Sequence, residues 1–192
     1  FPNRNEEQYY EYCPTCRDVV IEAEKQAQVD KVVPYRYRHV KGHYRAKVKG
    51  VAGKSVFVYS SDDSKSIFAT AVAREYLDMG APVRWISYPS LVIEQRGLYY
   101  SRYTPIQYAK EIAEYRGFLI IDGIGTGKPD NTTKHLVFYI LKRRKNLKLQ
   151  TLITSESPWS NLEDEIAPGT ATVIIAAGYE EVNLLMSEGD DR

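Results

Sequence analysis

A lysine followed by a serine, Lys65-Ser66, lies between a short apolar run and a longer apolar stretch. Residues 56–59 are β-branched or aromatic, which is typical of a buried strand, and residues 67–77 are apolar almost all round, which is typical of a buried helix. A strand, a polar loop and a helix that opens with Lys-Ser form the frame of a phosphate-binding loop. In that frame Lys65 and Ser66 would contact a nucleotide.

The loop lacks both glycines of the pattern G-x-x-x-x-G-K-[ST], because Tyr59 and Ser64 stand at their positions. Those glycines let successive backbone N–H groups converge on an anion, through positive φ angles that other residues adopt only at a cost. Asp62 and Asp63 add negative charge where phosphate would lie. An ordinary turn from strand to helix, with Asp63 or Ser64 as the helix N-cap, is the alternative interpretation.

A second candidate for the same site is Asp122, which closes the apolar run at residues 118–121. A carboxylate at such a strand end would lie beside the phosphate loop and hold Mg²⁺ through water. A simple turn residue is the alternative. The glycine-rich string at residues 123–128 is followed directly by Pro129, and no helix opens there, so we predict an ordinary loop rather than a phosphate site.

The elements that would position these residues alternate between strand and helix along the chain. A helix at residues 105–115, for example, has Thr104 as its N-cap and Pro105 in its first turn. Such alternation predicts an α/β fold, a doubly wound sheet of five parallel strands with helices on both faces. We expect strands near residues 56–59, 83–87, 118–122, 150–154 and 172–176, and helices near 19–29, 67–77, 105–115 and 132–146.

Length and composition allow one sizeable domain. The chain has 192 residues and a net charge of +1, and we divide it into a polar arm at residues 1–30 and a core domain at residues 31–192. No apolar run reaches the 18 or so residues of a membrane helix, and no signal peptide is visible, so we expect no membrane partner. Two cysteines do not make a disulfide framework, which favours a cytoplasmic location.

Those two cysteines, Cys13 and Cys16, have the C-x-x-C spacing of half a tetrahedral zinc site. His39 and His43 are the candidates for the other half, although 22 residues separate Cys16 from His39, more than in common zinc fingers. Two free thiols are the alternative. Zinc is therefore a candidate cofactor, with Cys13 and Cys16 as its ligands.

Residues 31–54 carry eight lysines and arginines and no acid, with three tyrosines interleaved. Cations follow a phosphate backbone and aromatic rings stack on bases, so this basic segment predicts sequence-tolerant binding of single-stranded DNA. A second basic cluster at residues 142–148 is expected to join it in one positive surface. A solvated basic strand pair is the alternative. The predicted nucleic-acid-binding residues are Arg36, Tyr37, Arg38, Lys41, Arg45, Lys47, Arg143 and Arg144.

From about residue 33 to residue 185 the chain resembles the DnaC/DnaI-type bacterial and phage helicase loaders and their IstB relatives, of the AAA+ class. Residues 54–73 are similar to the family's Walker A segment, residues 119–125 to its Walker B stretch and residues 151–155 to its sensor-1 strand. The resemblance implies a P-loop NTPase-like, AAA+-type sheet with the strand order fifth, first, fourth, third, second. It also adds weight to zinc binding, because the family's N-terminal region often binds zinc through cysteines.

The departures from the family pattern fall on residues of catalysis. Besides the two glycines, Gly123 replaces the second Walker B acid, Glu156 stands where the sensor usually has Asn, and the only arginine after Arg144 is Arg192. An arginine finger alone contributes about 10³-fold or more in rate. We therefore predict no catalytic residues, no appreciable ATP hydrolysis and no required cofactor.

The resemblance implies a helicase-loader-like DNA replication protein with a degenerate nucleotide site. Its expected partners are a replicative helicase or another replication protein, and single-stranded DNA; oligomer formation stays open. One alternative is an active ATPase that binds ATP and Mg²⁺ through Lys65, Ser66 and Asp122. The other is a structural or assembly protein that reuses the fold without nucleic acid.

Overall fold

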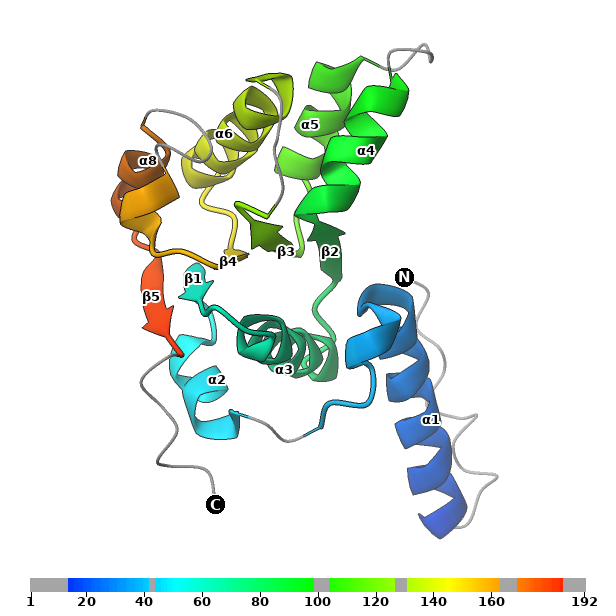
Figure 1. Ribbon diagram of the computed structural model, residues 1–192. Helices are drawn as coiled ribbons and strands as arrows, with labels where there is room; N and C mark the ends of the chain where they lie inside the picture. The colour runs from blue at the N-terminus through cyan, green and yellow to red at the C-terminus, as the bar shows by residue number, and fades with distance from the viewer. Residues whose placement is uncertain (1–13, 42–43, 99–103, 127–130, 163–168, 185–192) are drawn as a thin grey trace.

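The computed structural model describes residues 14–41, 44–98, 104–126, 131–162 and 169–184. One five-stranded sheet forms the centre of this part of the chain, with every neighbouring pair of strands parallel and the order β2-β3-β4-β1-β5 (Figure 1). The strands are β1 (Val56–Tyr59), β2 (Val83–Ser87), β3 (Phe118–Ile124), β4 (Thr151–Ser155) and β5 (Glu180–Asn183). The predicted parallel α/β sheet and its predicted strand order are both confirmed.

Helices cover both faces of the sheet (Figure 1). One face carries α1 (Pro14–Val32), the 3₁₀ helix η2 (Tyr35–Tyr37), α2 (Arg45–Val51) and α3 (Ser64–Asp78). The other carries α4 (Tyr88–Leu98), α5 (Pro105–Ala113), α6 (Asn131–Asn146), the 3₁₀ helix η3 (Trp159–Asn161) and α8 (Thr170–Ala176). Among the helices that the structure describes, none is both long and apolar enough to span a membrane.

Two apolar cores separate the sheet from its helices. In β1, Phe57 packs into the core under α4, α5 and α6, whereas Val56 and Val58 pack into the core under α1, α2 and α3. A strand that is buried on both faces reads as a continuous apolar run, which is why the sequence of β1 shows no alternation. Val29 of α1 belongs to the second core, so the predicted boundary at residue 30 falls within a helix that packs on α3.

Local signals determine where α5 begins. The Thr104 hydroxyl accepts a hydrogen bond from the Gln107 N–H (3.3 Å), and the Gln107 side chain accepts one from the Thr104 N–H (2.8 Å). This reciprocal capping satisfies two donors that the first turn cannot pair internally, and Pro105 lacks a third. The predicted helix after Thr104 is confirmed.

The strand predicted at residues 172–176 is wrong, because that run lies in α8 and the fifth strand is β5. Its β-branched residues favour a strand, but Gly169 and Gly178, both with positive φ, bracket a short helix. Ile174 is buried in the core and Ile175 is exposed, as expected for a helix that packs one side against the sheet. Among the strands that the structure describes, β5 pairs with β1 alone and tolerates polar residues at the sheet edge, so its sequence predicts a strand poorly.

Arg144, near the end of α6, is fully buried (0% exposed) and joins two turns at the amino end of the sheet. Its guanidinium donates to Thr151 Oγ1 (2.7 Å) and to the carbonyl oxygens of Tyr115 (2.7 Å), Gly117 (3.1 Å) and Gln150 (2.6 Å). Burial lowers its pKa to about 10. The prediction that Arg144 binds nucleic acid is wrong, because its guanidinium is buried and donates its hydrogen bonds to acceptors of the chain itself.

Replacing Arg144 with Met is expected to reduce the free energy of unfolding by about 3–5 kcal/mol. The methionine side chain fills the volume but leaves several buried carbonyl groups without a donor. Urea unfolding monitored by circular dichroism would measure the loss.

Arg143→Met is the matched control, because Arg143 is half-exposed and pairs with Glu114 of α5 at 2.8 Å. An exposed pair of this kind contributes about 1 kcal/mol or less. Equal effects of the two substitutions would contradict the structural role of Arg144.

Candidate functional site

Three polar residues, two of them predicted, meet at the carboxyl ends of adjacent strands. The Ser66 hydroxyl donates to Asp122 Oδ1 (2.8 Å), and the Thr154 hydroxyl donates to the same oxygen (2.6 Å). The Gly123 N–H in turn donates to Thr154 Oγ1 (2.7 Å). Ser66 follows β1, Asp122 lies on β3 and Thr154 lies on β4, which is between them in the sheet. The structure therefore brings Ser66 and Asp122 together through a third residue.

Sequence reasoning missed Thr154 as a member of this group. The available signal was its position near the end of the fourth apolar run, since the carboxyl ends of parallel strands meet at one edge. A carboxylate with two hydroxyl groups is a set of oxygen donors that suits Mg²⁺. The residues present thus fit the metal half of an ATP–Mg²⁺ site.

The loop that would hold phosphate lacks the backbone conformation of a phosphate-binding loop. Residues 59–66 include none of the positive-φ residues found in the described part of the chain. A cradle of converging N–H groups needs residues that alternate between right-handed and left-handed backbone conformations. The loop therefore follows an ordinary path from β1 to α3, and it avoids the conformation that would be costly at Tyr59 and Ser64.

The Asp62 carboxylate accepts hydrogen bonds from donors of this loop. Asp62 Oδ1 accepts hydrogen bonds from the Ser60 hydroxyl (2.5 Å) and from the Ser64 N–H (2.9 Å). The Ser60 hydroxyl first, and then the Ser64 N–H, lower the pKa of Asp62, because both bonds stabilise its ionised carboxylate. Lys65 is 6% exposed, and its Nζ donates to the backbone carbonyl of Asp62 (2.6 Å). The residues present do not fit a bound phosphate.

Asp63, at the N-cap position of α3, joins the loop to η2. Its Oδ1 accepts hydrogen bonds from Arg36 Nη2 (2.8 Å) and from the Tyr37 hydroxyl (3.1 Å), and Arg36 also donates to that hydroxyl. The Tyr37 side chain is buried (5% exposed) in the core under α1, α2 and α3, and burial raises its pKa. The prediction that Tyr37 binds nucleic acid is wrong, because its ring packs inward.

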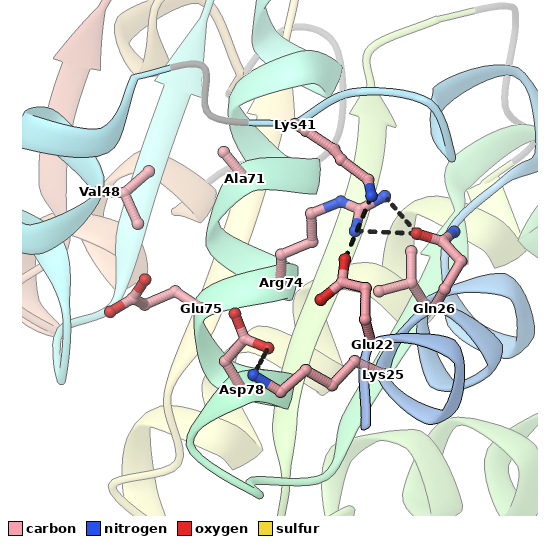
Figure 2. A pocket seen from close by; sticks show the side chains of 10 residues that line it. Glu22, Lys25, Gln26, Lys41, Val48, Ala71, Arg74, Glu75 and Asp78 are labelled. Carbon is pink, nitrogen blue, oxygen red and sulfur yellow. Dashed lines mark hydrogen bonds and ion pairs between the residues drawn. The ribbon is translucent and has the colours of Figure 1, made fainter. Parts of the chain in front are cut away.

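Other predicted DNA-binding cations are paired with acids of the fold. The basic segment forms η2 and α2 rather than the strand pair that was the alternative. Lys41 and Glu22 face each other in the pocket that residues of α1 and α3 line (Figure 2). Arg45 begins α2, and its side chain lies outside the described features. Lys47 lies over the Tyr44 ring at 5.8 Å. The ion pairs are Lys41–Glu22 (3.2 Å), Arg38–Asp30 (3.9 Å) and Arg143–Glu114 (2.8 Å).

The ends of the two basic segments lie side by side. Gln150, which follows the cluster at residues 142–148, donates through Nε2 to the Gly53 carbonyl, and the Thr151 N–H donates to Ser55 Oγ (3.2 Å). Both contacts lie at the amino end of β1 and β4, opposite the loop that carries Lys65. The chain that follows each basic segment therefore meets the other at this end of the sheet.

The zinc prediction has no test in this structure. Cys13 and His43 lie outside the described residues, and Cys16 is described only through the backbone of α1. Within residues 14–41, 44–98, 104–126, 131–162 and 169–184, no three His, Cys, Asp or Glu side chains form a cluster that could hold a metal ion. Zinc binding by Cys13 and Cys16 stays a prediction.

No protein-family model and no curated protein sequence shows a significant match to the chain. Solved structures do match. The DnaC helicase loader has a TM-score of 0.59 and 18% identity, over 76% of this chain and 92% of the loader. DnaI has a TM-score of 0.60 and 16% identity, over 82% of this chain and 93% of DnaI.

The replication initiator DnaA bound to AMPPCP and single-stranded DNA has a TM-score of 0.61 and 17% identity, over 79% of this chain. The chain spans half the length of that DnaA structure and of the AMPPCP-bound DnaA from Aquifex aeolicus. At these identities the likeness establishes the fold. The chain therefore has the P-loop, AAA+-type fold of these replication proteins, as its resemblance to DnaC/DnaI-type helicase loaders implied.

Proposed function

We propose that this chain is a helicase-loader-like DNA replication protein that acts by binding a replicative helicase, single-stranded DNA or both. Its nucleotide site is degenerate. The observation that carries this proposal is the bond from the Ser64 N–H to the Asp62 carboxylate, at the place where the fold would hold phosphate. Structures of the same fold include a helicase loader and an initiator bound to single-stranded DNA, which supports a role in replication.

An active ATPase is the second candidate. The hydrogen bond between Ser66 and Asp122 favours it, because it holds together two oxygen donors that suit Mg²⁺. Two features count against an ATPase. Tyr59 and Ser64 stand where a phosphate loop has glycines, and Lys65 donates to a carbonyl oxygen of its own loop. These features weaken the phosphate contacts on which phosphoryl transfer depends.

The proposal predicts that isothermal titration calorimetry detects no saturable binding of ATP with Mg²⁺ to the wild-type chain. It also predicts that any residual ATP hydrolysis is the same in Lys65→Ala, because Lys65 does not reach phosphate. A turnover of about 1 s⁻¹ or above that is abolished by Lys65→Ala would establish the ATPase instead.

For nucleic acid, the exposed groups of the basic segment are the proposed contacts. Tyr35 is 83% exposed, with the Arg38 guanidinium 5.6 Å from its ring centre, so it replaces Tyr37 as the aromatic face. Lys49 and Lys148 are exposed, and each lies within five residues of the contacts that join the two basic segments. Tyr35 lies on η2, which contacts Asp63 after β1, so Tyr35 and the two lysines are separate proposed contacts. Either would bind nucleic acid without reading base identity.

Single-stranded DNA is expected to bind weakly, with little dependence on sequence and with affinity that falls steeply as salt is raised. Lys49→Ala combined with Lys148→Ala should reduce the slope of log K against log salt by about 0.7 for each lost phosphate contact. Tyr35→Ala should cost about 1–3 kcal/mol if a base stacks on its ring. Fluorescence anisotropy at several salt concentrations would measure both.

Lys110→Ala is the control, because Lys110 is an exposed lysine of α5 that lies outside both basic segments. It should leave affinity and salt slope unchanged. No binding at low salt, or binding that salt does not weaken, would leave a protein partner as the only proposed target.

A further inference from the structure

The strand β2 forms one edge of the sheet, and a pocket lies beside it (Figure 1). We propose that this edge binds an extended, acidic segment of a partner protein, which adds to the sheet as a further strand beside β2. This inference rests on the proposed function in one respect, which is that the chain acts by binding another protein. It names the surface and the chemistry of the segment that the surface would take.

The backbone of β2 directs alternate residues to β3. The Phe118 N–H donates to the Pro82 carbonyl (2.9 Å), so in the parallel register Arg84 and Ile86 also bond to β3. Trp85, between them, directs its backbone N–H and C=O to the outer edge. Among the described residues, none is hydrogen-bonded to either of these two groups. An edge with unpaired backbone groups is a template for another strand.

The pocket beside β2 has a volume of about 370 Å³ and is lined from both faces of the sheet. Its lining residue Trp85 belongs to the core under α1, α2 and α3, and Ile86 belongs to the core under α4, α5 and α6. The end of α1 forms one wall, and α4 and α5 form the other. The strand β3, which the structure describes in full, contributes no lining residue. The pocket therefore lies along the outer side of β2, where an added strand would run.

The charges of this pocket favour an acidic occupant. Lys31, Arg38 and Arg84 line it, against one acid, Glu94. Arg38 and Arg84 are paired with acids of the fold at 3.9 Å and 3.0 Å, whereas Lys31 is exposed and forms no ion pair with a described residue. Glu94 accepts a hydrogen bond from the Tyr108 hydroxyl. The pocket thus keeps a positive charge for an acidic side chain of the partner.

Trp85 adds an unsatisfied donor to the same strand. Its Nε1 is buried and has no hydrogen-bond partner among the described residues. A buried donor without an acceptor destabilises the folded state. With its backbone N–H, Trp85 therefore gives the edge two donors that lack acceptors, and an acidic strand brings carbonyl and carboxylate oxygens.

A second copy of the chain fits this edge less well. Two β2 strands paired about a two-fold axis would place the cations that line one pocket beside the same cations of the other. Like charges that meet in an interface oppose binding. The charge of the pocket therefore favours a different, acidic molecule as the occupant.

The test is NMR of the full chain with a synthetic peptide of alternating valine and glutamate. At saturating peptide, hydrogen exchange of the Trp85 amide should slow by about tenfold or more, while the amides of Arg84 and Ile86, which already bond to β3, change little. Lys31→Glu should weaken binding about five- to tenfold, because an exposed attraction becomes a repulsion. Lys49→Glu is the matched control and should bind as the wild type does, since Lys49 is an exposed lysine outside the pocket.

Two altered peptides test how the segment binds. One has lysine in place of glutamate, and the other has every second backbone nitrogen methylated; neither should protect the Trp85 amide. Equal protection by either peptide would overturn the proposal, because acidic charge or backbone pairing would then not be required. No protection by the acidic peptide at millimolar concentration would also overturn it. A wild-type chain that is dimeric, with the Trp85 amide already protected, would assign the edge to a second copy instead.

The outcomes also separate the edge site from the proposed function. If a replicative helicase binds the chain while the acidic peptide does not, the edge site is refuted and the proposed function stands. If the peptide protects the Trp85 amide while neither a helicase nor single-stranded DNA binds, the edge site is supported and the proposed replication partners are wrong.

Discussion

Parallel pairing of β1, β4 and β3 is the constraint on which the candidate site depends. The register that places Tyr59 beside Ser155 and Ile121 beside Ile153 brings the carboxyl ends of these strands to one edge. Ser66, Asp122 and Thr154 then converge within hydrogen-bond distance without any sequence proximity. Because both faces of these strands are buried under helices, the site cannot change shape without disturbing the two apolar cores.

Much of this architecture could be predicted from local sequence. Continuous apolar runs mark the central strands, and Thr104 marks the start of α5, because burial and capping leave direct signatures in residue type. The burial of Arg144 could not be predicted from charge, since it lies in a cluster of cations. Arg144 follows the apolar residues Val137, Ile140 and Leu141 by seven, four and three positions. This spacing places it on the same face of the helix as they are, which was the overlooked sign that it faces the core.

The paired cations were misassigned for one reason, which is that their acidic partners lie in other segments of the chain. Arg36 looks like a phosphate-binding residue, and Asp63 looks like an obstacle to phosphate, when each is considered in its own segment. In the fold they are partners at 2.8 Å. Several cations of the basic segment thus pair with acids at the surface of the fold, which leaves part of the segment for a polyanion.

The central claim is that the Ser64 N–H donates to the Asp62 carboxylate rather than to phosphate. The most direct measurement is the amide chemical shift of Ser64 by NMR, followed through a pH titration and then through addition of ATP with Mg²⁺. We predict a shift that titrates with an apparent pKa below the usual aspartate value of 3.8 and that does not respond to nucleotide. A saturable change in the Ser64 and Lys65 amides on adding nucleotide would contradict the account.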